Sequence, residues 1–569
     1  YTYGPVSEID DEIRLLCRGD PALIDGQVKY TLHHVSLHEN SDYEALSYTW
    51  ADKNGKIDKE KRILIDDCIV NVGSNLAAAL SQLFSGDVDR KLILESFKDK
   101  GLGATLYRSE GPWGFDIIPS PPVNQDIHAI VHLFRRGYWA RSWIVQEVSF
   151  AKNITFYCGT SRMTWDDMKG VSDQFFKESP DLLRSLTSSS IGHVFYDLFS
   201  SGPNTVDHEN HTEVDAPTGS IHEVITRYRT KPVFDPRDKV YSVRSLMAFE
   251  KQELIPIDYD LEVETLFKAV TILIVSIEKD LSILAENKTS VGQAFSVTVG
   301  EKVSHIHPSW VPEWLVTNIE DKIRVDRIGI APGRTPEASG AGSIADCTIE
   351  REDILHMKAI NIGKITQIGP LMHGRDDDED GEIHFTAMFD ILYHWWLTCH
   401  SLTNKNMFGA NGFMDLLNFG QHGKQIAAYP ELCAEHEKKM ARYISILLAL
   451  YKPNDDTYEP KLDIPLALIS EEERHKAELS AWLVIQWYGK RKLIVYGDSN
   501  LGIGPRCVEV GDIIVVAPGC KVPVVLRASA KGDGNFVNIG DSYVEGMMEG
   551  RAIADVENGS RKFETFSLV

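Results

Sequence analysis

A repeat of tryptophan and glutamate in the first third of the chain offers the most usable chemistry in the sequence. Trp139, Trp143 and Glu147 follow one another at intervals of four residues. On a helix this spacing places the three side chains on one face. A carboxylate beside indole rings suits a base or a partner for sugar hydroxyls. The same spacing also fits tryptophans of a core with a locally paired glutamate, and the residues alone leave both interpretations open.

Other catalytic signatures are largely missing from the sequence. There is no GxxxxGK[ST] phosphate loop, no GxGxxG that follows a strand, no HExxH and no GxSxG. Two groups of histidines have spacings that can bind zinc, but no cysteine or carboxylate completes either group convincingly. These histidines are His33, His34 and His38, and His208 and His211. We therefore expect neither a metal site nor a resident cofactor.

The composition excludes several classes of protein. The 569 residues carry a net charge of −24, which disfavours sequence-independent binding to nucleic acid or to anionic membranes. The eight cysteines contain no CxxC pair and are too sparse for a disulfide scaffold, so reduced thiols are expected. No apolar run is long enough to span a bilayer, and the first residues lack a secretory pattern. These features predict a cytoplasmic protein without a membrane span.

The first part of the chain alternates strand and helix patterns, which predicts an α/β domain over residues 1–170. The expected strands are 12–17, 30–35, 43–50, 63–65, 68–72 and 154–158, and the expected helices are 76–84 and 127–151. Residues 91–125 interrupt the alternation, because the strand pattern at 91–94 leads into Lys-, Gly- and Pro-rich sequence and not into a helix. This segment is either an irregular loop or a site at which connecting chain is absent.

The remainder of the chain predicts two further regions. Residues 171–345 are mainly helical, with helices near 180–200, 219–230 and 262–285. Residues 346–569 form a β-rich C-terminal domain with a helical insertion at about 380–490. Its expected strands are 508–510, 512–516 and 522–526, and the strand 354–362 is expected to join them across the insertion. The helix over 383–400 contains His394-Trp395-Trp396, which fits a core helix better than a pocket wall.

Several motifs resemble the fungal heterokaryon-incompatibility (HET) domain. Tyr43-Glu-Ala-Leu-Ser-Tyr-Thr-Trp50 resembles the opening motif, Tyr138 to Glu147 the closing helix, and Cys158-Gly159 the strand that follows it. Later segments are similar to long members of the family. These segments are Asp235–Tyr241, Pro256–Tyr259, Pro308–Trp314, Leu501–Pro505, Gly511–Asp512, Pro523–Arg527 and Tyr543–Gly550. We expect Pro308–Trp314 to be a structural docking segment, and Gly502 and Gly504 to supply turns with positive φ.

The resemblance implies a fold, a site and an activity. The HET domain is similar to TIR domains, which have an open sheet, and many TIR domains cleave the nicotinamide–ribose bond of NAD. By this resemblance Glu147 is the catalytic residue, and Ser47, Tyr48, Trp50, Arg141 and Trp143 bind the substrate. NAD is then a substrate and not a cofactor. Assembly into a homo-oligomer is also possible, because TIR-like enzymes often complete their sites in this way.

One departure from the family pattern keeps other functions open. The family normally carries W-[IV]-D-x-x-C-I-N-Q followed by a helix with a Glu-Arg pair, and neither follows Arg90–Leu94. Three classes therefore remain: an incompatibility or cell-death effector that hydrolyses NAD, a biosynthetic cyclase or pericyclase with an apolar aromatic pocket, and a non-catalytic interaction module. The first is preferred, with a small-molecule partner that is a nucleotide in the first class and an apolar metabolite in the second.

Overall fold

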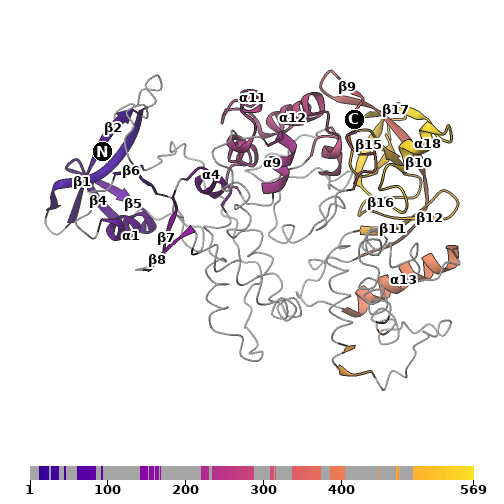
Figure 1. Ribbon diagram of the computed structural model, residues 1–569, viewed down its shortest axis with the longest axis horizontal. Helices are drawn as coiled ribbons and strands as arrows, with labels where there is room; N and C mark the ends of the chain where they lie inside the picture. Colours follow the sequence, from indigo (N-terminus) through magenta and orange to yellow (C-terminus); the bar gives the residue numbers. More distant parts are fainter. Residues whose placement is uncertain are drawn as a thin grey trace. The chain divides into compact units, whose positions relative to one another are not determined.

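A computed structural model gives the arrangement of the chain (Figure 1). The residues that it describes are 12–24, 27–36, 44–46, 61–84, 91–93, 141–151, 153–158, 161–165, 167, 219–229, 233–286, 308–312, 314, 336–372, 385–403, 442, 446, 469–471, 473–474 and 491–569. The chain divides into two compact units. One comprises 1–183 with 194–213, and the other comprises 184–193 with 214–569. The finer division at residues 170 and 345 stays a prediction.

The first unit contains a mixed six-stranded sheet in the order β3-β6-β1-β2-β4-β5. The strands are β1 (Glu12–Ile24), β2 (Gln27–Ser36), β3 (Glu44–Ala45), β4 (Lys61–Ile65), β5 (Cys68–Val72) and β6 (Lys91–Ile93). Only the β2–β4 and β3–β6 pairs are parallel. The unit thus mixes helix and strand as expected. An open sheet of the doubly wound kind is mostly parallel, and most pairs here are antiparallel. A TIR-like open sheet therefore stays a prediction.

One helix packs on this sheet and supplies its core. Helix α1 (Ser74–Leu83) buries Leu76, Leu80 and Leu83, which recur at the spacing of one helix face. They pack with Tyr30 of β2 and with Phe84, whose rings meet edge to face at 5.2 Å between centroids. The same unit contains helix α4 (Ile144–Ser149) and the antiparallel hairpin of β7 (Thr155–Cys158) and β8 (Ser161–Thr164).

The first described part of the second unit is a series of short helices. These are α9 (Ile221–Tyr228), α10 (Asp238–Tyr241), the 3-10 turn η3 (Arg244–Leu246), α11 (Phe249–Gln252) and α12 (Val263–Leu273). The expectation of one helix over 262–285 is wrong beyond residue 278. A π turn, η4 (Ile274–Glu278), follows α12, and Lys279 then adopts a left-handed conformation with φ 53°. The 3-10 turn η5 (Ser282–Glu286) completes this segment.

Five strands of the second unit form a closed ring (Figure 1). Around the ring, β10 pairs with β13, β13 with β14, β14 with β15, β15 with β17, and β17 with β10. The strands are β10 (Ile354–Leu371), β13 (Ile513–Val516), β14 (Val524–Ala528), β15 (Phe536–Asp541) and β17 (Phe563–Leu568). The prediction that strand 354–362 joins the C-terminal strands is confirmed.

Further elements extend this ring along the long strand β10. Strand β9 (Cys347–Glu350) pairs with its start, and β11 (Arg491–Tyr496) pairs with its end. The sheet continues through β12 (Asn500–Pro505) to β16 (Tyr543–Val544), and helix α18 (Arg551–Glu557) follows. The expected strand at 508–510 is wrong, because the chain turns there before Gly511 at φ 106°.

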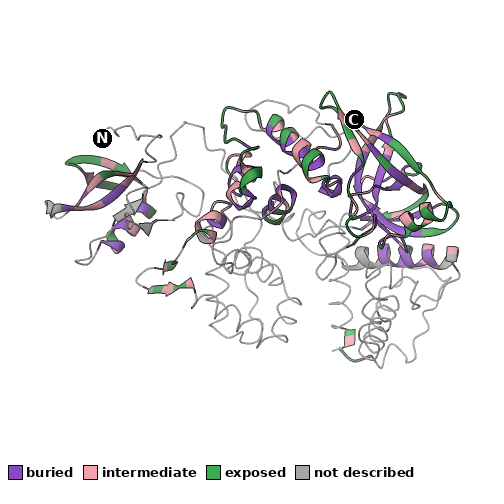
Figure 2. Cartoon of the chain, turned by 45° about the horizontal axis from the view of Figure 1, so that its top comes forward, coloured by how far each residue is buried: buried purple, intermediate pink, exposed green. Residues whose placement is uncertain are grey.

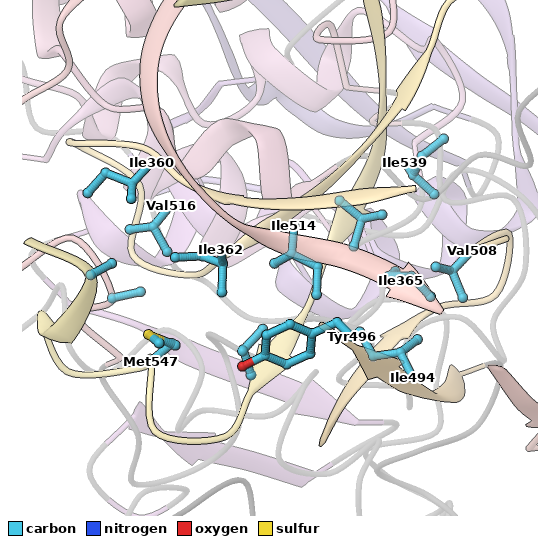
Figure 3. Close-up of a cluster of buried hydrophobic side chains, with 14 residues drawn as sticks. Ile360, Ile362, Ile365, Ile494, Tyr496, Val508, Ile514, Val516, Ile539 and Met547 are labelled. Atoms are coloured by element: carbon cyan, nitrogen blue, oxygen red, sulfur yellow. The ribbon is translucent and has the colours of Figure 1, made fainter. Parts of the chain in front are cut away.

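Branched aliphatic side chains fill the interior of the ring. Ile360, Ile362 and Ile365 of β10 point toward Ile494, Tyr496, Val508, Ile514, Val516, Ile539 and Met547 (Figure 3). Tyr496 is 2% exposed, and this burial raises its pKa to about 12. Because β10 precedes the helical insertion and the other strands follow it, the hydrophobic core joins segments that are remote in sequence.

Helix α13 (Phe385–Thr403) contributes buried side chains to a core. Most of its positions between Ile391 and Cys399 are buried, and His394 is exposed (Figure 2). Trp395 is fully buried, and its indole Nε1 donates to the carbonyl of Pro370 at 2.9 Å. Gly369 lies beneath this ring, where an added Cβ would come within 3.1 Å of Trp395 Cδ1. The core interpretation of this helix is therefore confirmed.

Two motifs that carry the family resemblance have structural roles. Arg237 binds Asp235 through Nη2 at 2.7 Å and Nε at 2.9 Å, and it also donates to the carbonyl of Leu261. Tyr259 donates from its hydroxyl to Asp238 at 2.7 Å. These bonds fasten α10 to the segment that precedes α12. The 235–241 and 256–259 motifs therefore hold one another in place.

The other motifs also contribute to packing. Trp310 and Trp314 are fully buried, and Trp314 meets Phe267 of α12 edge to face at 5.0 Å, so the docking role expected for 308–314 is confirmed. The expectation for the glycines is wrong, since Gly502 and Gly504 lie inside β12 and not in a turn. A Cβ at Gly502 would come within 2.5 Å of the Tyr543 carbonyl oxygen, so glycine is required there by the approach of β16.

Candidate functional site

The start of helix α4 brings together three of the predicted site residues. Trp143 is the N-cap of the helix, and the amide of Glu147 donates to its carbonyl at 3.3 Å, one turn later. Arg141 Nη2 lies 3.2 Å from Glu147 Oε1 and forms an ion pair with it. The side chains of Arg141 and Glu147 are 23% and 24% exposed. The carboxylate is thus fixed by a guanidinium yet remains in contact with solvent.

The structure leaves part of the predicted site undescribed. Ser47, Tyr48 and Trp50, and also Trp139, lie outside the described residues. The helix expected over 127–151 is described only from Ile144 to Ser149, with Arg141 to Trp143 leading into it. Trp143 and Glu147 therefore do share one helical turn, whereas the rest of the predicted cluster stays a prediction.

A second candidate site lies in the unit that contains the barrel. It is a pocket of about 310 Å³, which we call the serine–lysine pocket. Its lining residues are Ser220, Glu278, Lys279, Asp280, Ser282, Glu337, Ser339, Gly340, Ala341, Gly342, Ser343, Ile344, Gly519 and Lys521. They come from the N-cap of α9, the turn after η4, the 337–344 loop and the loop between β13 and β14. Four regions of the chain therefore build one hollow.

The left-handed residue Lys279 sets the directions of the two acidic side chains beside it. Glu278 accepts from the backbone amides of Ile221 at 2.6 Å and His222 at 3.1 Å, and from Lys251 Nζ at 2.7 Å. It therefore neutralises the positive N-terminus of α9. Asp280 instead faces the His222 ring, with 2.6 Å between Oδ2 and Nδ1, and accepts from the Ser282 amide at 2.8 Å.

A buried network of charged groups continues behind the pocket. The other ring nitrogen of His222 lies 3.4 Å from Glu286 Oε1, and Glu286 is fully buried. Glu286 also accepts from the Thr226 hydroxyl at 3.1 Å and pairs with Arg229. The network satisfies a carboxylate that would otherwise be costly to bury, and it ties α9 to the 278–286 segment.

This network predicts a pH-dependent contribution to stability. Burial opposes ionisation of Asp280, but hydrogen bonding and charge from His222 and the Ser282 amide outweigh it, so the pKa of Asp280 lies below its ordinary value. A depressed folded-state pKa stabilises the fold above the unfolded value of about 3.9, and this contribution is lost as pH falls through the folded value. We expect Asp280→Asn to cost about 1.5–3 kcal/mol at pH 7.

Urea unfolding of the full chain between pH 3 and pH 7 measures this effect. The difference between Asp280→Asn and the wild type should shrink steadily below about pH 4. Asp498→Asn is the matched control, because Asp498 is exposed on the turn between β11 and β12. A difference that stays constant across this pH range would contradict the assignment of the linkage to Asp280.

The described residues give no support for a metal site. Among them, no group of three or more His, Cys, Asp or Glu side chains is placed to hold a metal ion. His33 and His34 occupy neighbouring positions on β2, and His33 lies 3.0 Å from the hydroxyl of Thr31. His38, His208 and His211 lie outside the described part of the chain. Within the part that is described, no helix is long and apolar enough to cross a membrane.

The serine–lysine pocket was not predicted from the sequence. Ser339-Gly-Ala-Gly-Ser343 is a short run of small residues without a phosphate-loop pattern, and Lys279 lies inside an apparently continuous helical pattern. The left-handed Lys279 and the glycines at 340 and 342, with φ of 84° and 69°, are visible only in the folded backbone. A Gly-x-Gly between serines is the one local signal, and it is weak by itself.

Comparison with known proteins finds a family model that matches the C-terminal part. Residues 453–566 match the family model of the Het-6 beta-barrel domain. This span contains strands β11 to β16, whereas β10, which closes the ring, precedes it.

The similarity extends beyond the barrel. Over 485 residues the chain is 22% identical to "Heterokaryon incompatibility protein 6, OR allele" of Neurospora crassa, an alignment that covers 78% of this chain and 68% of that protein. No solved structure matches the chain. The two matches support the relationship to heterokaryon-incompatibility proteins that the motifs indicated.

Proposed function

We propose that this protein is a fungal incompatibility-type effector whose first unit hydrolyses NAD at Glu147. The similarity to a heterokaryon incompatibility protein supports the effector role. The observation that carries the proposed chemistry is the Arg141–Glu147 pair at the start of α4, with Trp143 one turn before the carboxylate. The same residues form the motif that resembles the closing helix of a HET domain.

The proposed reaction breaks the bond between C1′ of the ribose and the nicotinamide nitrogen. Nicotinamide leaves as a neutral molecule with the bonding electrons, so its departure needs little acid catalysis. Water adds to C1′ and releases one proton to solvent, which gives ADP-ribose. Glu147 accepts a hydrogen bond from a ribose hydroxyl and stabilises the positive charge that develops on the sugar. Trp143 offers a face for stacking, and Arg141 offers donors for the diphosphate.

Turnover of NAD by the purified full chain tests this proposal. We expect nicotinamide release by the wild type and a fall of about a hundredfold or more in Glu147→Ala, because the stabilising carboxylate is lost. Glu147→Gln is the matched control, because it keeps the shape of the side chain and removes its charge. It should be nearly as inactive as Glu147→Ala. Circular dichroism and thermal melting verify that both variants fold. Equal turnover by the wild type and Glu147→Ala would overturn the proposal.

Assembly is a second part of this proposal. If a second copy completes the site, turnover per chain should rise with protein concentration, and the active species should elute as an oligomer in size-exclusion chromatography. Specific activity that is constant across a hundredfold range of concentration, in a monomeric sample, would remove the requirement for assembly and leave the role of Glu147 intact.

A further inference from the structure

We propose that the serine–lysine pocket binds a small hydroxylated molecule that carries a phosphate monoester. This inference is independent of the NAD-hydrolase proposal, because the pocket belongs to the second unit and Glu147 to the first. Nothing in the chemistry of the pocket requires that Glu147 be active.

The acidic residues of the pocket are mostly engaged with the protein. Glu278 is held by Lys251 and by the two amides that open α9, and its side chain is only 7% exposed. Asp280 is held by His222 and the Ser282 amide. Glu278 therefore already has a positive partner in Lys251, and Asp280 already has hydrogen-bond partners within the protein. Glu337 is the remaining carboxylate of the lining, and it is exposed.

Two lysines of the lining are not engaged in this way. Lys279 and Lys521 are exposed, and neither amine has a carboxylate within ion-pair distance among the residues that the structure describes. The Gly519 carbonyl accepts from the Leu281 amide at 2.8 Å. This bond holds the loop that carries Lys521 beside the segment that carries Lys279. Because both lysines line the same hollow, an anion there has two ammonium groups available to it.

Hydroxyl groups on the opposite loop add a neutral binding surface. Ser339 and Ser343 are joined through their Oγ atoms at 2.6 Å, and Ser343 also accepts from the Gly519 amide at 2.9 Å. The two hydroxyls carry two protons, and the bond between their Oγ atoms uses one of them. The other proton is available to a ligand. Glu337 offers an acceptor for a ligand hydroxyl. The arrangement therefore favours a phosphate beside the lysines and hydroxyls beside the serines and Glu337.

The backbone frame of the pocket is fixed before any ligand arrives. The Ala345 amide donates to the Lys279 carbonyl at 3.0 Å, and the Lys521 amide donates to the Ser282 hydroxyl at 3.1 Å. Gly519 has φ 77°, and a Cβ there would come within 2.5 Å of the Ala345 nitrogen. The volume of about 310 Å³ is at the lower end of ligand pockets, which favours a sugar phosphate or mononucleotide over a dinucleotide.

Isothermal titration of the full chain with ribose 5-phosphate, ribose and inorganic phosphate tests the inference. We expect ribose 5-phosphate to bind more tightly than either of its parts, and to bind less tightly at high salt. The double variant Lys279→Ala/Lys521→Ala should bind it at least tenfold more weakly. The matched control is Lys531→Ala/Lys562→Ala, which removes the same charge from exposed lysines outside the pocket and should bind like the wild type.

Three results would overturn the inference. They are no binding of ribose 5-phosphate by the wild type, equal weakening in the two double variants, or ribose binding as tightly as its phosphate. Loss of NAD turnover in Glu147→Ala with unchanged ribose 5-phosphate binding separates this site from the proposed hydrolase site, so that each proposal can fail by itself.

Discussion

Replacing Arg491 with alanine is expected to lower the free energy of unfolding of the barrel by about 3–5 kcal/mol. Arg491 of β11 donates from Nη2 to Asp541 Oδ1 at 2.7 Å and from Nη1 to the Asp541 carbonyl at 3.2 Å. Both side chains are only 5% exposed. The alanine variant would leave the Asp541 carboxylate buried without its guanidinium partner, and that desolvated charge is the source of the loss.

Urea unfolding, with hydrogen exchange read on peptides from β11 and β15, measures this change in the full chain. Arg491→Met/Asp541→Leu should lose less than Arg491→Ala, because removing both charges leaves neither one buried alone. Arg506→Ala is the matched control, since Arg506 is exposed on the nearby turn and should change stability by no more than about 0.5 kcal/mol. A cost for Arg491→Ala no larger than this control would show that the pair is not a buried charge pair.

Replacing Arg229 with alanine is expected to have an effect of similar size in the helical part of the second unit, about 3–5 kcal/mol. The reason is the complete burial of Glu286, for which Arg229 supplies the positive charge. Thr226 and His222 would remain as hydrogen-bond partners of the carboxylate. They do not replace the full charge of the guanidinium.

A second substitution distinguishes lost charge from lost packing. In the Arg229→Ala background, Glu286→Gln should recover part of the stability, because a neutral amide is less costly to bury than a carboxylate. Arg227→Ala, on the same helix, is the control. Arg227 is 39% exposed and pairs with Glu223 on the surface, so its loss should cost about 0.5 kcal/mol or less. If Glu286→Gln destabilises the Arg229→Ala protein further, the charge explanation is wrong.

Local sequence patterns predicted many of the described elements. The alternation in β4 and β5, the spacing of Leu76, Leu80 and Leu83 in α1, and the apolar run that became α12 all satisfied rules of period and length. The placement of 354–362 beside the C-terminal strands also succeeded, since its alternating apolar side chains need other strands to pack against.

The failures arose where a distant contact overrides local preference. The pattern over 262–285 is helical in composition, but Lys279 becomes left-handed so that Glu278 reaches α9 and Asp280 reaches His222. Gly502 looks like a turn residue, yet it lies in a strand because the Tyr543 carbonyl approaches it closely. The α9 residues lie more than 30 residues from Glu278 and Asp280, and Tyr543 lies more than 30 residues from Gly502. A short stretch of sequence therefore does not contain both partners of these contacts.

The sequence by itself determined the motifs, the relationship to heterokaryon-incompatibility proteins, the mixed classes of the two units, and the turn that joins Trp143 to Glu147. Each of these depends on residues that are close in the chain or on short sequence motifs. Tertiary structure alone decided the closure of the strand ring through β10, the burial of Glu286 and the assembly of the serine–lysine pocket. These features depend on backbone bonds and burial between segments tens to hundreds of residues apart, and such energies exist only once the chain has folded.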